Sequence, residues 1–281
     1  MHAIRLFLLL VLTFFPAGRV LAEPAAEDAP VDVALIVSID VSGSVNAQRY
    51  LLQMDGVAGA LEDPAVAAAM LGGPHGSIMF AMVEWSEGAK TVIPWTRLAS
   101  RTDISALAAR VRRTPRAPGE FTCLAHMMAY VHDLVAPTLP VKASRVVMDV
   151  SGDGIDNCDG DDATGARRDE LVATGLTING LPINDGDPDE PLRAGAFRAP
   201  GRPFENRMRV AGVIQTLEPW YRRYVIGGSA AFLLPAHGYG DFSEAIRQKF
   251  TMEISAVRPR PGGPAMRLRE SANIGAAHGR S

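Results

Sequence analysis

Apolar residues recur along the chain in short runs that alternate with amphipathic segments. Five runs have the length and the β-branched or aromatic content of strands, and they cover residues 32–39, 77–85, 145–151, 176–183 and 229–236. Between them, helical spacing of apolar residues is found in 46–61, 104–111, 124–135, 163–173 and 242–250. Strands that alternate with helices of this length are typical of parallel sheets joined by crossover helices. The pattern therefore predicts an α/β fold: a doubly wound, mostly parallel central sheet with helices on both faces.

Two features refine the predicted sheet. The runs 32–39 and 77–85 are almost continuously apolar, which is typical of central strands that are covered on both faces. A further short run, 89–95, follows the second strand after only Ser86, Glu87 and Gly88. A parallel connection needs a longer crossover, so this run predicts an antiparallel strand at the edge of the sheet.

The two ends of the chain differ from the patterned region. Arg5 precedes an apolar run over 6–15, and small residues at 20–22 offer a cleavage point, so residues 1–22 are predicted to be a signal peptide. This run is shorter than the roughly 20 residues that span a bilayer, and no later segment is long and apolar enough. We expect a short linker at 23–30, one domain at 31–255 and a disordered basic tail at 256–281. The mature protein is then exported, to the periplasm or the medium.

Composition excludes some functions. The chain has 28 Lys and Arg residues against 31 Asp and Glu, a formal charge of −3, which gives no support for nucleic-acid binding. It has two cysteines, Cys123 and Cys158. An even count in an oxidising compartment favours a disulfide, whereas the alternative is two separate buried thiols.

Oxygen-bearing side chains lie in three of the predicted loops. Asp40, Ser42 and Ser44 come directly after the first strand, Thr122 precedes the helix at 124–135, and Asp153 follows the strand at 145–151. In an open sheet of this class, loops at the carboxyl ends of the strands converge and hold the ligand. Carboxylates and hydroxyls are hard oxygen ligands that suit Mg²⁺. The sequence therefore predicts a cation site at this edge.

Each element also has an ordinary structural interpretation. Ser44 could cap the helix at 46–61, and Thr122 could cap the helix at 124–135. The acidic stretch 153–162 could be a solvated loop. A metal site is favoured because all three groups of oxygen-bearing residues occur together, in the order along the chain that such a site requires and at the ends of strands.

These residues resemble the metal-ion-dependent adhesion site (MIDAS) of von Willebrand factor type A domains, and the resemblance covers most of residues 31–255. The phrases "SIDVSGSV", "VVMDVSGDG", "LTINGLPI" and "YVIGGSAAFLLPA" are similar to a group of exported bacterial A-like domains of unassigned function. The resemblance implies that Ser42, Ser44 and Thr122 contact the metal directly, and that Asp40 and Asp153 contact it directly or through water. It also implies an open position for a carboxylate of a protein partner. Two departures are Gly152, where the family often has a hydroxyl, and Cys123 next to Thr122.

Other chemistries find less support in the sequence. His126 and His132 are six residues apart, which does not place them on one helical face for zinc. The acidic run before Gly160 has Ile155 at the first ligand position of an EF-hand loop. Motifs for a nucleophilic serine, a phosphate-binding loop or a dinucleotide site are absent from the sequence.

Two further clusters have a structural and a functional interpretation. Trp220, Tyr221, Tyr224, Arg222 and Arg223 have the composition of an interface hot spot, but packing of a helix end is the favoured interpretation. The acidic residues of the loop after the fourth strand could bind Ca²⁺, although a solvated turn is favoured; they are Asp185, Asp187 and Asp189.

The sequence thus predicts an exported protein-binding module of the adhesion type. Its cation would be Mg²⁺, or else Mn²⁺ or Ca²⁺, and its partner would be a protein that presents an acidic residue. The alternative is a metal-dependent hydrolase that uses the same cation to activate water. Because no residue is nominated as nucleophile or base, a binding role is favoured over an enzyme.

Overall fold

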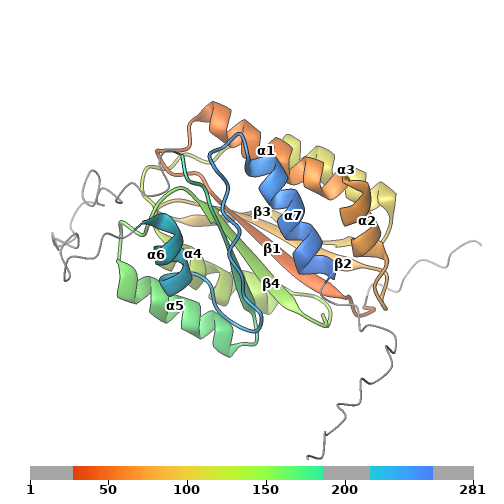
Figure 1. Ribbon diagram of the computed structural model, residues 1–281. Helices are drawn as coiled ribbons and strands as arrows, with labels where there is room; N and C mark the ends of the chain where they lie inside the picture. The colour runs from red at the N-terminus through yellow and green to blue at the C-terminus, as the bar shows by residue number, and fades with distance from the viewer. Residues whose placement is uncertain (1–27, 186–215, 256–281) are drawn as a thin grey trace, which may run out of the picture.

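The computed structural model describes residues 28–185 and 216–255, which form a five-stranded sheet between two layers of helices (Figure 1). The strands are β1 Val33–Asp40, β2 Ile78–Trp85, β3 Ala89–Leu98, β4 Val146–Gly152 and β5 Thr177–Pro182. Their order is β3-β2-β1-β4-β5, and every pair is parallel except β2 and β3. This confirms the predicted fold class and four of the five main predicted strands.

β1 lies at the centre of the sheet and its eight residues are all buried. Successive side chains of a strand point to opposite faces, so β1 contributes to two cores. Leu35 and Val37 belong to one core, and Ile36 to the other. Ser38 and Asp40 follow Ile36 at intervals of two and therefore share its face of the sheet.

The helices divide into two layers, one on each face of the sheet (Figure 1). The first layer holds α1 Ala47–Glu62, α2 Pro64–Leu71, α3 Arg101–Arg112 and α7 Phe242–Ser255. The second holds α4 Leu124–Tyr130, α5 Asp161–Ala173 and α6 Leu217–Tyr224. The predicted helices are all present, while α2 and α6 were not predicted as separate helices.

Side-chain caps fix where three of the helices begin. The side chain of Asn46 accepts a hydrogen bond from the backbone of Arg49 and caps α1. Asp63, followed by Pro64, caps α2, and Ser100 caps α3. The alternative in which Ser44 caps the first helix is therefore wrong, because Asn46 holds that position.

The predicted helix at 124–135 changes geometry along its length. It is α-helical to Tyr130, continues as a π-helical turn over Val131–Val135, and ends in a 3₁₀ turn at Ala136–Thr138. Its N-cap residue is Cys123, whose side chain makes no capping hydrogen bond. Thr122 is therefore not the cap of this helix, and its hydroxyl is used elsewhere.

The prediction of a fifth strand at 229–236 is wrong, because this segment does not form a regular strand. This segment pairs with β5 only through isolated bridges, Gly180 with Leu233 and Ile183 with Ala236. Gly228 and Ala230 have φ angles of 92° and 57°, in the left-handed region, which an extended strand does not use. The segment nevertheless runs along the outer edge of β5 and covers it.

β3 is the antiparallel edge strand that the run 89–95 predicts, and it extends to Leu98. Its pairing with β2 is irregular, with register shifts between Phe80 and Val83. Pro94, which lacks a backbone N–H, lies in the same part of β3.

The helix α7 carries a buried charge cluster into the first layer. Lys249 is fully buried, with its Nζ 3.0 Å from Asp149 Oδ1 and 2.6 Å from Glu253 Oε1. Asn179 on β5 donates a further hydrogen bond of 2.8 Å to Glu253. The cluster links β4, β5 and α7.

Some predictions fall on residues outside this description. They are the signal peptide at 1–22, most of the linker at 23–30, the tail at 256–281, and Asp187 and Asp189. Trp220 and Tyr221 on α6 are buried, which confirms packing as their role rather than exposure at an interface. Among the described helices, none is long and apolar enough to span a membrane.

Candidate metal site at the carboxyl edge of the sheet

The predicted site residues lie where β1 and β4 end. Asp40 is the last residue of β1, and Asp153 follows Gly152, the last residue of β4. Because these strands are neighbours and parallel, both carboxylates lie at the same edge of the sheet. The loop that carries Thr122 joins them there.

The five predicted residues form one connected group. The backbone N–H of Ser42 donates to Asp40 Oδ1 at 2.8 Å, and the hydroxyls of Ser42 and Ser44 are 3.3 Å apart. Thr122 Oγ1 donates to Ser42 Oγ at 3.4 Å. Ser44 Oγ donates to Asp153 Oδ1 at 2.6 Å. The structure thus brings together all the residues that the sequence nominated.

The group runs from the protein interior to the surface. Asp40, Ser42 and Thr122 are buried, and Ser44 is exposed. One side of the group therefore faces solvent and is accessible to a ligand from outside.

The electrostatics of the site centre on Asp40. Burial, with the nearby charge of Asp153 as a second cause, raises the pKa of Asp40 to about 8. Its Oδ2 atom is buried and has no hydrogen-bond partner in the protein. A buried carboxylate oxygen without a partner is costly, and a bound cation would satisfy it.

The donor set fits a hard divalent cation. It consists of two carboxylates and three hydroxyls, which are the oxygen ligands preferred by Mg²⁺ and, with more ligands, Ca²⁺. Within residues 28–185 and 216–255, no three His, Cys, Asp or Glu side chains are grouped as for a metal.

Residues that the sequence analysis missed hold the loop after β1 in place. Arg116 donates to the carbonyls of Val41 and Ser42 at 2.7 and 3.0 Å. Gly43 N donates to the carbonyl of Glu120 at 3.1 Å, so the loop after β1 is tied to the loop that carries Thr122. These contacts join segments about 75 residues apart, and no local motif marks them.

The Asp153 side also has partners from distant segments. Tyr239 donates its hydroxyl to Asp153 Oδ2 at 2.9 Å. Arg49 donates to the carbonyl of Ser44 at 2.7 Å, lies 3.9 Å from Asp153 Oδ2, and pairs with Asp185. Asp185 is therefore engaged in an ion pair with Arg49 rather than lying free in a solvated turn.

A disulfide joins two of the site loops. Cys123 and Cys158 are bonded, with their Cα atoms 5.2 Å apart. Thr122 directly precedes one of these cysteines, and Asp156 lies close to the other. Asp156 is buried and accepts hydrogen bonds from the backbone N–H groups of Ala125 and Cys158, among others. The stretch 153–162 is therefore an anchored loop, rather than simply a solvated acidic one.

Other candidate groups do not form a competing site. His126 contacts the carbonyl of Glu87 and the carboxylate of Asp159, while His132 pairs with Asp133. The two imidazoles are thus used separately and are both partly exposed.

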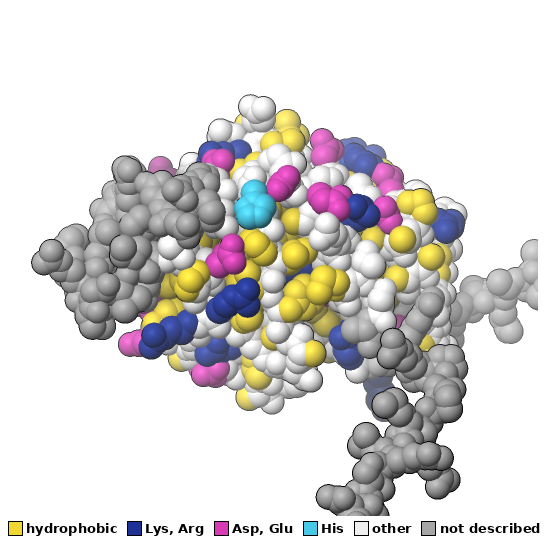
Figure 2. Space-filling view, viewed as in Figure 1, with side chains coloured by type: hydrophobic (Ala, Val, Ile, Leu, Met, Phe, Trp, Pro, Cys, Tyr) yellow, Lys and Arg dark blue, Asp and Glu magenta, His cyan; other side chains and the backbone are white. Residues whose placement is uncertain are grey.

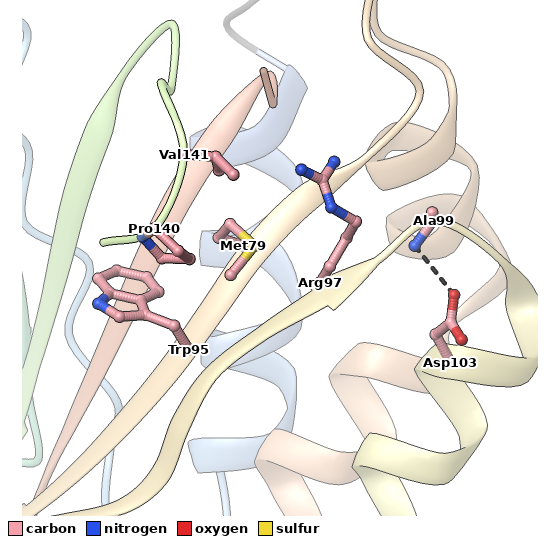
Figure 3. Close-up of a pocket in the computed structure, with 7 residues that line it drawn as sticks. All are labelled: Met79, Trp95, Arg97, Ala99, Asp103, Pro140 and Val141. Carbon is pink, nitrogen blue, oxygen red and sulfur yellow. Dashed lines mark hydrogen bonds between the residues drawn. The ribbon is translucent and has the colours of Figure 1, made fainter. Parts of the chain in front are cut away.

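A pocket of about 370 Å³ lies near the other end of β2, far along the strand from Trp85 and Asp40 (Figure 3). Its polar groups take part in structural contacts. Asp103 accepts from the backbone of Ala99 and from Ser100, and Arg97 donates to Ser77. Figure 3 shows Trp95, Met79, Pro140 and Val141 on its apolar side.

A second hollow of about 360 Å³ lies beside the candidate site. It is bounded by Val41, by Pro118, and by the turn between β2 and β3.

On the face of the molecule that Figure 2 shows, basic and acidic side chains are interspersed. That face thus shows no broad basic patch of the kind that binds nucleic acid.

The fold places this protein in a known class. The structure is similar to proximal thread matrix protein 1 from the mussel byssus, with a TM-score of 0.54 and 15% identity over 80% of this chain. A further structure of that mussel protein, described as having a zinc-occupied MIDAS motif, has a TM-score of 0.53 and 14% identity over 81% of this chain. The pilus adhesin SpaC from Lactobacillus rhamnosus GG has a TM-score of 0.53 and 14% identity over 82% of this chain. The fold is that of a von Willebrand factor type A-like domain.

The family of the chain follows from its sequence. A family model described as protein of unknown function (DUF1194) matches residues 30–258, and the chain belongs to this family. No curated protein matches the chain. The chain spans 48% of the first mussel structure, 47% of the zinc-occupied one and 31% of SpaC.

Proposed function

We propose that this protein is an exported protein-binding module of the adhesion type that uses a divalent cation, first of all Mg²⁺. The cation would be held by Asp40, Ser42, Ser44, Thr122 and Asp153. An acidic residue of a protein partner would complete its coordination shell, so the partner is a protein that presents a carboxylate on an exposed surface.

One observation carries this proposal. Three loops place two carboxylates and three hydroxyls in a connected group, yet Asp40 Oδ2 is left buried without a partner. Burial and the charge of Asp153 raise the pKa of Asp40, and no Lys or Arg is ion-paired to Asp40 in the described part of the chain, so this site favours binding of an external cation. Ordinary surface loops do not retain such an arrangement, because it lowers stability.

The residues of the chain would have distinct roles. Asp40, held by the Ser42 N–H, would supply negative charge from inside the fold, and Thr122 and Ser42 would supply neutral oxygens. Ser44 lies at the exposed side, where the partner would approach. A bound cation would supply the positive charge that attracts the carboxylate of the partner.

Two further observations support export and adhesion. A disulfide is typical of oxidising compartments, which agrees with the signal peptide predicted at 1–22. Among proteins of similar fold are a pilus adhesin and a matrix protein of a byssus, one of whose structures has a metal in a MIDAS motif. These neighbours support a cation-dependent binding role outside the cytoplasm.

The test is capture of a partner with and without the cation. Mature protein immobilised on a resin should capture a discrete protein from an envelope extract in Mg²⁺, lose it in EDTA, and recover it when Mg²⁺ is restored. Asp40→Ala should capture nothing, while Asp55→Ala, which removes an exposed acid from α1, should behave as wild type.

The same preparations separate binding from catalysis. Turnover of phosphoester or peptide substrates that requires Mg²⁺ and is lost in Asp40→Ala would replace the binding proposal with a hydrolase. If the partner protein is captured equally well in EDTA and in Mg²⁺, binding does not depend on a cation and that part of the proposal is wrong.

A further inference from the structure

Two glycines on neighbouring strands make room for one side chain. A Cβ atom added to Gly180 on β5 would lie 3.0 Å from Cδ1 of Tyr221. One added to Gly152 on β4 would lie 2.9 Å from the hydroxyl of Tyr221 and 3.0 Å from Asp40 Oδ2. Glycine inside a strand weakens it, and often marks a place where another group must come close. The group that comes close here is the phenol of Tyr221.

The two atoms that meet at Gly152 are both unsatisfied. The hydroxyl of Tyr221 is buried and makes no hydrogen bond to the protein, and Asp40 Oδ2 is buried and makes none either. One atom carries a proton to donate and the other accepts. Buried polar groups of this kind are nearly always paired, directly or through a water molecule.

The direction of the phenol is fixed by its helix. Tyr221 lies on α6, where the indole N–H of the adjacent Trp220 donates to Asp161 at 2.9 Å and ties the helix to the start of α5. The ring of Tyr221 packs edge-on to Trp220, with centroids 5.7 Å apart. The hydroxyl is thereby held at the underside of the candidate metal site, on the buried face where a partner does not reach.

We propose that Tyr221 is a positioning residue for Asp40. Its hydroxyl donates, through one bridging water molecule next to Gly152, to one lone pair of Asp40 Oδ2, and the second lone pair of this oxygen is left for the cation. With Oδ1 already held by the N–H of Ser42, this second link fixes the rotation of the carboxylate and presents it to the cation. The inference rests on the proposed function, because its consequence is tighter cation binding at the same site.

The first experiment removes only the hydroxyl. The dissociation constant for Mn²⁺ and for Mg²⁺ is measured by titration calorimetry on the mature protein. Tyr221→Phe should weaken binding about tenfold or more, as loss of a group that orients a metal ligand does. Tyr224→Phe, on the same helix with its ring against Trp220, is the matched control and should bind as wild type.

A second variant moves the hydroxyl onto the strand. Gly152→Ser alone should weaken binding, because its Cβ would collide with the hydroxyl of Tyr221. Gly152→Ser combined with Tyr221→Phe removes the collision with the Tyr221 hydroxyl, keeps the 3.0 Å approach of the new Cβ to Asp40 Oδ2, and places a serine hydroxyl beside that oxygen. The double variant should therefore bind the cation more tightly than either single variant, which a purely structural role of Tyr221 would not produce.

A readout without metal completes the test. A high-resolution crystal structure of the metal-free protein should show one ordered water within hydrogen-bond distance of both Tyr221 and Asp40, and Tyr221→Phe should lose it. If Tyr221→Phe binds the cation as wild type does while Asp40→Ala does not bind, the inference is wrong and the proposed function stands. If wild type binds no divalent cation, both are wrong.

Discussion

Two carboxylates on neighbouring central strands, Asp40 and Asp149, are fully buried on opposite faces of the sheet. Burial is the main cause that raises the pKa of both, to about 8 for Asp40 and about 7 for Asp149. Their neighbours differ. Asp149 has the ammonium group of Lys249 at 3.0 Å, whereas the main charged neighbour of Asp40 is a second carboxylate, Asp153.

The difference separates a structural role from a binding role. A buried carboxylate is costly unless a cation or several donors compensate it. For Asp149 the chain supplies that cation itself, from α7. For Asp40 the chain supplies the N–H of Ser42 and no ion-paired Lys or Arg among the described residues. Because Lys249 compensates its charge, Asp149 has a structural role. Because no such cation compensates Asp40, that carboxylate is available to a ligand.

The largest effect is expected from removing the internal cation. Lys249→Met leaves Asp149 and Glu253 close together without a positive charge, which should lower the free energy of unfolding by about 3–5 kcal/mol. Urea unfolding of purified protein measures this. Arg247→Met, two residues away on an exposed face of α7, is the control and should change stability little. Equal stability of Lys249→Met and wild type would contradict a structural role for the cluster.

The next effect tests how the Asp40 side is held. Cys123→Ser with Cys158→Ser opens a bridge between residues 35 apart, which should cost up to about 4 kcal/mol in the chain-entropy model. It should also weaken cation binding, because the loop that carries Thr122 is no longer fixed to the 153–160 loop. Thermal unfolding and metal titration measure both against oxidised wild type, and reduced wild type should behave like the double variant. Unchanged cation affinity would show that the bridge serves stability alone.

Cation binding itself should give a smaller gain in stability. A cation at 100 times its dissociation constant should stabilise wild type by about 2.7 kcal/mol. Asp40→Asn should show no such gain, and its metal-free form should be at least as stable as wild type at neutral pH, because the amide, unlike a carboxyl whose pKa is raised to about 8, does not have to take up a proton on folding. Thermal melts in EDTA and in Mg²⁺ measure this. Stabilisation by Mg²⁺ that is equal in both proteins would contradict the site.

The smallest effect is a change in pH dependence. The folded-state pKa of Asp149, about 7, exceeds its ordinary value of 3.8, so the folded protein binds this proton more tightly than the unfolded chain does. The contribution of Asp149 to stability is then complete below pH 3.8 and is lost as the pH rises to about 7. Lys249 opposes this shift and Glu253 adds to it.

Asp149→Asn should therefore flatten the pH dependence of the free energy of unfolding in that window, and should leave cation binding unchanged. Urea unfolding at a series of pH values measures the slope. An unaltered slope would mean that Lys249 keeps Asp149 ionised throughout, and weakened cation binding would show that the two faces of the sheet are coupled.

Much of the fold could be predicted because its signals are local. The buried central strands are apolar over nearly their full length, and the edge strand follows after a three-residue turn. The segment 229–236 misled because its apolar content is that of a strand, while Gly228 and Ala230 take left-handed conformations that composition does not reveal. The short α2 is rich in alanine and lacks a distinct apolar face, so periodicity gave no signal for a helix after the one predicted at 46–61.

The candidate site shows the same limit. Asp40, Ser42 and Ser44 could be nominated because they follow one strand, and Asp153 because it follows another. Arg116 and Tyr221 could not, because they reach the site from segments with no motif, and only the packing of the loop and of α6 directs them there. Sequence thus indicated the residues that would contact a ligand better than the residues that hold them.

The two edges of the sheet bear on how this protein behaves at high concentration. Open strand edges recruit strands of other molecules and so start aggregation. Here the segment 229–236 lies along β5 and takes up its outer carbonyl and N–H groups at Gly180. On the other side, Pro94 and the register shifts interrupt β3, and the hydroxyl of Tyr130 accepts from the backbone of Thr91. Neither side edge therefore offers a long free template on which a strand of another molecule could pair.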